Sequence, residues 1–260
     1  MTWNIETTDR LSAEQIEGVL SGVCAAIRVP HFCCAPVVER LTELLLSDPE
    51  KANYRVKWSR LNSPAGVREE LEETDTERIG PTDSNLDPDG ADYCRMAAER
   101  IRRIRDRLDP YMSPIDRLRL ELDEIFPHGA RLHTYPSGAK AMAGVGRLMR
   151  HSAALIHADA GRAECLTANV YLKLPAKGGT VSIWDHSSPG SDGSYLFEGS
   201  DIPSGVPSVT LLPAPGDLII WNPSKPHVIH SFADDIRLTM QVWLKFDRTP
   251  DGKLGVTLLN

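Results

Sequence analysis

The chain has 260 residues, of which 25% are charged and 41% hydrophobic, with a net charge of −7 at pH 7. This length and composition are typical of one large globular domain, or of one domain with a helical extension. The absence of a basic stripe argues against a nucleic-acid-binding protein, and no window of about 18 apolar residues predicts a membrane span. No signal peptide is recognised at the N-terminus and the five cysteines are irregularly spaced, so we expect a cytoplasmic protein without a disulfide framework.

The N-terminal half is predicted to be mainly helical. Apolar residues recur at three- and four-residue steps in four segments, which is the spacing of one helix face. Ser12 is a good N-cap for the first segment, and Pro36 and Pro114 fit the first position of the second and fourth. The predicted helices cover about residues 12–28, 36–46, 91–108 and 114–126.

Between the second and third helices the pattern is weaker. Alternation of Tyr54, Val56 and Trp58 predicts a short strand, whereas the acidic residues 69–77 and the Pro- and Gly-rich residues 80–90 predict a long surface loop. The third helix carries several arginines interspersed with acidic residues, so we expect a solvated outer face rather than an anion site; these are Arg100, Arg102, Arg103, Arg105 and Arg107.

After Pro127 strands become the rule. Short apolar or alternating segments are separated by turns rich in Gly, Pro and Ser, which is typical of a barrel or sandwich. The sequence therefore predicts an α+β protein, with a helical region over residues 1–128 bracing a barrel over residues 129–260 in one integrated domain. The expected strands are 130–135, 153–157, 165–174, 180–184, 209–212, 217–221, 227–231 and 238–246.

A candidate metal site begins with His157 and Asp159. Residues i and i+2 of a strand share a face, so both side chains can point at one ion. Imidazole and carboxylate together suit a first-row metal, and two His with one carboxylate are the usual ligands of non-haem Fe(II) oxygenases. A lone His-x-Asp is a weak signal, so the order of the motifs that follow it matters.

Five further motifs follow in a fixed order: the strand Cys165–Leu172, Gly178-Gly179, Pro215-Gly216-Asp217 through Trp221, Pro226-His227-Val228-Ile229, and the strand Arg237–Trp243. This set resembles the Fe(II)/2-oxoglutarate-dependent dioxygenases, especially the prolyl-hydroxylase-like branch, over about residues 129–247. It is also similar to freestanding bacterial natural-product hydroxylases and halogenases. Ile229 and Trp221 replace the valine and phenylalanine of the family pattern. The resemblance implies a double-stranded β-helix (jelly-roll) barrel.

The resemblance also implies roles for individual residues. His157, Asp159 and His227 match the Fe(II) ligands. Arg237 matches the residue that anchors the distal carboxylate of 2-oxoglutarate, which the planar guanidinium can bind through two hydrogen bonds. Tyr171 matches a tyrosine that meets the same carboxylate. Because a buried unpaired guanidinium is costly, we expect Arg237 to have an anionic partner.

Other residues are weaker candidates for the pocket. Thr239 shares a strand face with Arg237, and Asn169 and Thr167 share a face with Tyr171. Tyr135 matches a tyrosine near the iron, and a packed strand end is the equal alternative. It lies 22 residues before His157, a wider gap than is usual in the prolyl-hydroxylase-like branch. His230 competes with His227 as a ligand, but a three-residue step along a strand turns it to the other face.

The implied reaction uses O2 and 2-oxoglutarate to hydroxylate a small molecule, with ascorbate as a candidate reductant. Asp159 predicts hydroxylation or another non-halogenating oxidation, because halogenases of this type have Gly or Ala at that position. The expected substrate is a free amino acid or a natural-product intermediate, and the protein is expected to be a monomer or a homodimer. The alternative functions are a peptidyl or prolyl hydroxylase, a cupin-type metal enzyme and a non-catalytic barrel. The chain lacks the His-x-His of cupins. Specificity is expected in residues 51–90, 139–152 (a substrate loop with Arg147 and Arg150) and 186–207, with 187–205 as a lid.

Overall fold

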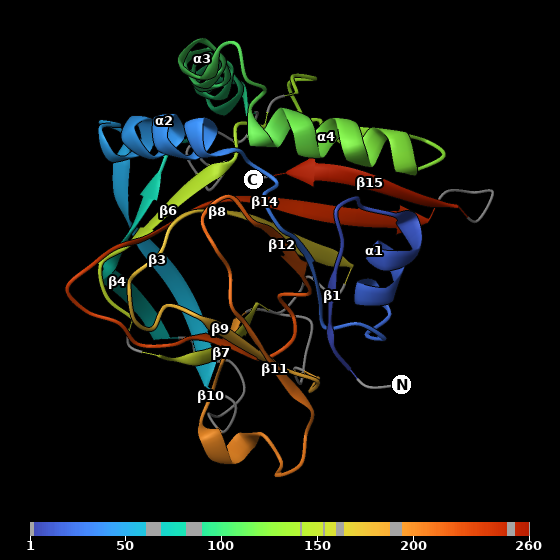
Figure 1. Cartoon of the computed structure of the whole chain (residues 1–260), viewed down its shortest axis with the longest axis vertical. Helices are drawn as coiled ribbons and strands as arrows, with labels where there is room; N and C mark the ends of the chain where they lie inside the picture. The colour runs from blue at the N-terminus through green and yellow to red at the C-terminus, as the bar shows by residue number, and fades with distance from the viewer. Residues whose placement is uncertain are drawn as a thin grey trace.

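The computed structural model describes residues 3–60, 69–81, 90–140, 142–152, 154–159, 164–187, 194–248 and 253–259. Within them the chain is a mixed α/β protein, with four α-helices and fifteen strands in one hydrogen-bonded sheet (Figure 1). The helices are α1 (Ala13–Leu20), α2 (Ala35–Leu46), α3 (Ala91–Leu108) and α4 (Pro114–Ile125), and a short 3-10 helix covers Gly199–Asp201.

Strands from both halves of the chain build the sheet. The N-terminal strands are β1 (Ile5–Thr7), β2 (Ala26–Val29), β3 (Lys51–Arg60) and β4 (Glu69–Ile79). The others are β5 (Ala130–Leu132), β6 (Val145–Met149), β7 (Ile156–Asp159), β8 (Cys165–Lys173), β9 (Val181–Trp184), β10 (Ser194–Phe197), β11 (Ser208–Leu211), β12 (Leu218–Trp221), β13 (His227–Ile229), β14 (Arg237–Arg248) and β15 (Leu254–Leu259). The N-terminal region is therefore part of the sheet as well as a helical layer.

The hydrogen-bonded order is β1-β2-β12-β8-β14-β6-β4-β3-β10-β7-β13-β9-β11, with β15 and β5 beside β14. Its two end strands do not pair with each other in the described residues, so the sheet is not closed. Helices α2 and α4 cover the part of the sheet that holds β6, β14, β8 and β12, while β7, β9 and β11 lie on the other side of these strands (Figure 1).

Strand alternation gives β8 and β14 one apolar face and one face of mixed character. On β8 and β14 the residues that face the helices are apolar, and they join the main core with Leu41, Leu45, Leu118 and Leu122. The residues between them face the opposite side, where Tyr171 packs with Ile183, Ile219 and Trp221 in a second cluster. The helix-facing residues are Ala168, Val170, Leu172, Leu238, Met240, Val242 and Leu244.

The first predicted helix was too long. Ser12 and Gln15 form a capping box and α1 begins as expected, but it ends at Leu20 and the chain turns at Gly22, whose φ is 76°. Residues 26–29 then form β2 between β1 and β12. The helical spacing of Val23 and Ile27 was misleading, since Val23 is 55% exposed whereas Ile27 is buried in the sheet. Pairing with distant strands outweighed the local pattern.

Three segments expected to be loops contain strands. Residues 69–79 form β4, which pairs with β3 and β6, and residues 145–149 form β6 within the predicted substrate loop. Strand β10 lies within the predicted lid and pairs with β7 and β3. Polar composition suggested loops, but backbone hydrogen bonds to distant strands hold these segments. Residues 82–89 and 188–193 of the predicted loops lie outside the described residues.

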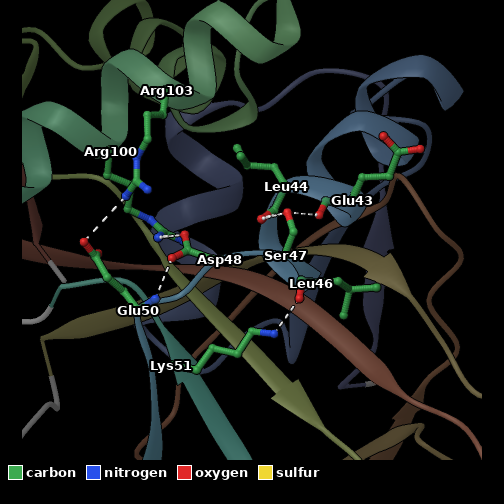
Figure 2. Close-up of polar contacts among 9 residues, drawn as sticks. All are labelled: Glu43, Leu44, Leu46, Ser47, Asp48, Glu50, Lys51, Arg100 and Arg103. Atoms are coloured by element: carbon green, nitrogen blue, oxygen red, sulfur yellow. Dashed lines mark hydrogen bonds and ion pairs between the residues drawn. The ribbon is translucent and has the colours of Figure 1, made fainter.

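Arg100 was expected on the solvated face of its helix and is instead 1% exposed. Its guanidinium donates to Asp48, which follows α2, at 2.5 Å, as Figure 2 shows. Gly80 leaves the space that the guanidinium fills, because a Cβ there would lie 2.6 Å from its central carbon. The Asp48 carboxylate also accepts from the backbone N–H of Glu50 at 2.9 Å. This buried ion pair connects α3 to the end of α2 and the start of β3.

We predict that Asp48→Asn lowers the free energy of unfolding by about 3–5 kcal/mol, because it leaves the Arg100 guanidinium buried without an anion. Arg103→Gln is the matched control, since Arg103 is 43% exposed and lies 3.7 Å from Glu50; it should change stability by less than about 1 kcal/mol. Urea unfolding followed by circular dichroism measures both. Equal stabilities of the two variants would contradict a structural role for the pair.

Candidate metal and co-substrate site

Two buried histidines face each other across neighbouring strands. His157 of β7 and His227 of β13 are directly paired in the antiparallel register, and their ring centroids are 4.2 Å apart. They are 8% and 5% exposed. Directly opposed residues of paired strands project on the same side, so the pairing brings together two imidazoles that are separated by 70 residues of sequence.

Both rings are held in the same tautomer. The Nδ1 atom of His157 lies 3.0 Å from the carbonyl oxygen of Leu155, and that of His227 lies 2.9 Å from the carbonyl oxygen of Lys225. A carbonyl oxygen only accepts, so each Nδ1 carries the hydrogen and each Nε2 keeps its lone pair. A backbone contact of this kind orients a histidine that binds a metal through its other nitrogen.

The pocket keeps these rings neutral. Burial lowers the pKa of His157 below its usual value, and burial together with the nearby His157 lowers the pKa of His227 to about 3. The negative charge of Asp159 opposes both shifts. A lowered pKa favours the neutral imidazole, which is the form that binds a metal.

Asp159 ends β7, two residues after His157. Its backbone N–H donates to the carbonyl oxygen of Pro223 at 2.8 Å, and its side chain lines one pocket together with His227. In the part of the chain that the structure describes, no three His, Cys, Asp or Glu side chains are already gathered as a metal-binding group. Two imidazoles are thus in place, with one carboxylate close to them.

Arg237 begins β14 and is 2% exposed. Its Nη2 donates to the Tyr171 hydroxyl at 3.2 Å and its Nε donates to the carbonyl oxygen of Gly179 at 3.3 Å; Nη1 lies 3.7 Å from the sulfur of Met149. No carboxylate pairs with Arg237 among the described residues. Burial accordingly lowers the pKa of this guanidinium. A buried cation whose partners are all neutral is a site for an anion.

The guanidinium opens onto the same pocket as His227 and Asp159. The pocket is small, with a cavity volume of about 20 Å³. Its polar wall includes Thr167, whose hydroxyl accepts from Asn169 Nδ2 at 2.9 Å and from Gln241 Nε2 at 3.0 Å. The lining residues are Arg147, Asp159, Thr167, Asn169, Val181, Trp221, Pro223, His227, Ile229, Arg237 and Gln241.

Tyr171 and Thr239 are not among the residues that line the pocket, although they lie on the strands that form it. They are opposite each other on β8 and β14, and both are 0% exposed. The Thr239 hydroxyl makes no hydrogen bond in the described residues. Thr239 is two residues from Arg237 on the same strand, so both side chains are on one face. The Thr239 hydroxyl can therefore donate or accept a hydrogen bond on the face where the guanidinium lies.

Tyr135 and His230 lie elsewhere. Tyr135 does not line the pocket and packs in a separate small cluster, with its ring centroid 5.1 Å from that of Tyr93. His230 is exposed, and its Nε2 lies 2.7 Å from the hydroxyl of Ser182 on β9. The structure therefore brings together His157, His227, Asp159, Arg237 and Asn169, with Tyr171 and Thr239 directly behind them.

No family model matches the chain. A curated relative, L-gamma-glutamyl-L-propargylglycine hydroxylase from Streptantibioticus cattleyicolor, is 34% identical over 68 residues. That match spans 25% of this chain and 25% of the length of the relative.

Solved structures similar to this chain include HygX from Streptomyces hygroscopicus, with nickel, 2-oxoglutarate and hygromycin B bound. It is 13% identical with a TM-score of 0.47, over 90% of this chain and 86% of HygX. Another is the epimerase SnoN in complex with Fe3+, alpha ketoglutarate and nogalamycin RO, which is 19% identical with a TM-score of 0.45, over 84% of this chain and 78% of SnoN. Each of these two structures contains a transition metal together with 2-oxoglutarate.

Six of the lining residues were not named from the sequence as metal or co-substrate residues: Arg147, Val181, Trp221, Pro223, Ile229 and Gln241. Arg147 was assigned to a loop, although it lies on β6 opposite Thr239. Trp221 was noted only as a departure from the family motif, yet its indole lies 6.3 Å from the His227 ring. Gln241 is on the face of β14 that carries Arg237 and Thr239, so the two-residue period of that strand could have identified it.

None of the helices among the described residues combines the length and the apolar character that crossing a membrane would require.

We predict that the metal-free protein loses stability as the pH falls below about 6.5, and that His227 contributes to this loss. Its folded pKa of about 3 is below the unfolded value, so the unfolded chain binds the proton first. The stabilisation is complete above pH 6.5 and decreases toward pH 3, by about 1.4 kcal/mol per pH unit. Between pH 6.5 and 5, wild type should lose about 2 kcal/mol more than His227→Gln in urea unfolding with a chelator present. Identical pH dependences would contradict a buried neutral His227.

Proposed function

We propose that the chain is an Fe(II)- and 2-oxoglutarate-dependent oxygenase that hydroxylates an unactivated C–H of a small molecule. One observation carries the proposal: Arg237, a buried guanidinium without a carboxylate partner among the described residues, opens onto the pocket that holds His227 and Asp159. A pocket with an anion site beside paired neutral imidazoles suits a chelating dicarboxylate such as 2-oxoglutarate.

The strand order supports a double-stranded β-helix. Strands β6-β14-β8-β12 are neighbours in one part of the sheet, and β7-β13-β9-β11 are neighbours in the other. Along the chain, β6, β8, β12 and β14 alternate with strands of the second group, as expected when a long hairpin winds into a jelly roll. Helices α2 and α4 cover the first group and α3 packs on α2 (Figure 1), which favours a single integrated unit rather than two domains.

In this proposal His157 and His227 bind the metal through Nε2 and Asp159 supplies the carboxylate. The donor set fits Fe(II), because two imidazoles and one carboxylate leave adjacent positions open. The Asp159 carboxylate must rearrange relative to the two rings to complete the site. When bound, the metal would supply O2 activation coupled to decarboxylation of 2-oxoglutarate.

Arg237 would hold the distal carboxylate of 2-oxoglutarate. Its Nε and Nη2 already donate to Gly179 and Tyr171, so these contacts fix the plane of the guanidinium before the co-substrate arrives. The free hydroxyl of Thr239 is a further donor on that face. The protein thus orients the co-substrate, and its apolar walls, which include Val181, Ile229 and Trp221, exclude water.

A carboxylate at position 159 occupies the site that chloride would need in a halogenase, so hydroxylation is the proposed outcome. We propose an amino-acid-like small molecule or natural-product intermediate as substrate. This is supported by the curated relative, whose name describes the hydroxylation of a γ-glutamyl dipeptide.

The first test is binding of Fe(II) and 2-oxoglutarate without O2, which should give a weak visible charge-transfer band, followed by succinate release in air. We predict that His227→Gln and Asp159→Ala each abolish succinate release, because each removes a metal ligand. His230→Gln is the matched control, since His230 is exposed and bonded to Ser182; it should retain most of the wild-type rate. If the wild-type protein showed neither the band nor succinate, the oxygenase function would be excluded.

We predict that Arg237→Gln weakens 2-oxoglutarate binding roughly 10- to 100-fold, which is the effect of losing a charge-assisted pair of hydrogen bonds. Calorimetry with the metal-loaded protein measures the Kd. Binding of 2-oxobutanoate, which lacks the distal carboxylate, is the ligand control and should change by less than about threefold. Because the substitution removes a buried unpaired charge, the ligand-free variant should be at least as stable as wild type. Equal losses for both ligands would contradict the assignment of Arg237 to the distal carboxylate.

A further inference from the structure

Three polar side chains line the pocket, and the proposed function gives them no role. They are Thr167, Asn169 and Gln241, here called the carboxamide wall. Thr167 and Asn169 are two residues apart on β8, so they share a face, and Gln241 is opposite Asn169 on β14. Both strands have partners on each side, so the register of the sheet fixes the positions of these side chains.

The Thr167 hydroxyl holds both carboxamides by their nitrogens. Its oxygen accepts from Asn169 Nδ2 at 2.9 Å and from Gln241 Nε2 at 3.0 Å, which uses both of its lone pairs. Each carboxamide keeps a carbonyl oxygen and a second N–H. Among the described residues neither carbonyl oxygen accepts a hydrogen bond, and neither is one of the fully buried polar atoms that lack a partner. Because Asn169 is 4% exposed and lines the pocket, its unused carboxamide edge opens into the pocket.

The carboxamide wall presents acceptors and donors together, and none of them is charged. A carbonyl oxygen beside an N–H is complementary to an amide, which offers an N–H and a carbonyl oxygen in return. An ammonium group suits the wall less well, because a buried cation needs an anion. Among the described residues that line the pocket the one carboxylate is that of Asp159, which is proposed to bind the metal. An apolar group would leave the wall unsatisfied.

The carboxamide wall lies beside the metal-ligand candidates. Trp221 is opposite Thr167 on β12, lines the pocket and has its ring centroid 6.3 Å from that of His227. Arg237, in contrast, is four residues from Gln241 along β14, which is about 13 Å of strand. A molecule that brings a C–H close to the metal therefore meets this wall, whereas the distal carboxylate of 2-oxoglutarate is assigned to Arg237.

Resting on the proposed function, we propose that the carboxamide wall binds an amide group of the substrate. Asn169 accepts from the amide N–H through its carbonyl oxygen and donates its second N–H to the amide carbonyl oxygen, and Gln241 offers another acceptor and donor beside it. Thr167 is a positioning residue that holds both carboxamides in this orientation. The substrate class is accordingly an acylated amino acid or a dipeptide rather than a free amino acid.

Thr210 provides a matched control for substitutions of Thr167. It is an exposed residue of β11 whose hydroxyl lies 2.8 Å from that of Ser182, and it does not line the pocket. Thr210→Val therefore makes the same chemical change on another strand of the sheet. Thr167→Val keeps the shape of the side chain but removes the hydroxyl that holds the carboxamides, and Thr167→Ser restores it. Gln241→Met removes one carboxamide at a partly exposed position.

The experiment measures binding by calorimetry to the Fe(II)-loaded protein without O2 and with 2-oxoglutarate present. The probes are N-acetyl-L-amino acids and γ-glutamyl dipeptides, each against the ester in which oxygen replaces the amide N–H, together with free L-amino acids. Binding of 2-oxoglutarate alone is measured for every variant. Thermal melting checks folding, and Gln241→Met replaces Thr167→Val in every comparison if the latter does not fold.

In wild type and Thr210→Val at least one amide probe should bind about 10-fold or more tightly than its ester, because an ester oxygen leaves the acceptors of the wall unsatisfied. Thr167→Val and Gln241→Met should reduce this preference to less than about threefold, and Thr167→Ser should restore it. Binding of 2-oxoglutarate should change by less than about threefold in all variants.

The inference is overturned if wild type binds amide and ester equally, if no amide probe binds, or if free amino acids bind more tightly than their acylated forms. It is also overturned if the Thr167 and Gln241 variants weaken 2-oxoglutarate binding and leave the amide preference unchanged, because the wall would then serve the co-substrate. Failure of wild type to bind 2-oxoglutarate at all would instead overturn the proposed oxygenase function on which the inference rests.

Discussion

The two-residue alternation of β8 and β14 is the constraint on which the rest of the structure depends. One face of these strands is apolar and is covered by α2 and α4, with Val170 and Met240 packed against Leu41 and Leu118 in one core. Burial of each such side chain contributes about 1.5–3 kcal/mol, so the register of the strands is strongly fixed. The same register directs Arg237 to the opposite face. A shift by one residue would place the guanidinium among leucines, which is far more costly than any gain in packing.

Fixing the register also brings the histidines together. Strands β7 and β13 are short, with four and three residues, and they pair at one position, His157 with His227. The intrinsic strand propensity of such short segments contributes little, so their placement depends on hydrogen bonding to the neighbouring strands β10 and β9. The carbonyl oxygen two residues before each histidine accepts a hydrogen bond from its Nδ1 and so fixes the tautomer. This local backbone contact leaves Nε2 of each ring as the atom that can bind the proposed metal.

Sequence reasoning predicted the helices α2, α3 and α4 from helical periodicity and from Pro at the first turn of α2 and α4. The site candidates His157, Asp159, His227 and Arg237 came from spacing and from a motif order that resembles a known family, and their roles stay predictions. Its errors have one physical cause. Strands β2, β4, β6 and β10 exist because distant strands supply their hydrogen bonds, and polar or helix-like local patterns hid them. Arg147 was assigned to a substrate loop because β6 was not predicted. The burial of Arg100 was missed because the carboxylate of Asp48, 52 residues earlier, is what makes it tolerable.

The side chains of the pocket lower the stability of the folded chain. Arg237 is buried with only neutral partners, Thr239 holds an unused hydroxyl, and two imidazoles are kept neutral by burial. The first two features lower the stability of the folded state, and the imidazoles do so below about pH 6.5; an anion or a metal ion would relieve them. The surrounding sheet, braced by the apolar core and by the buried Arg100–Asp48 pair, must therefore supply the stability that the pocket lacks. Ligands that satisfy these groups bind only the folded chain, so the same features that weaken the empty protein would make its binding of a metal and a dicarboxylate strong and selective.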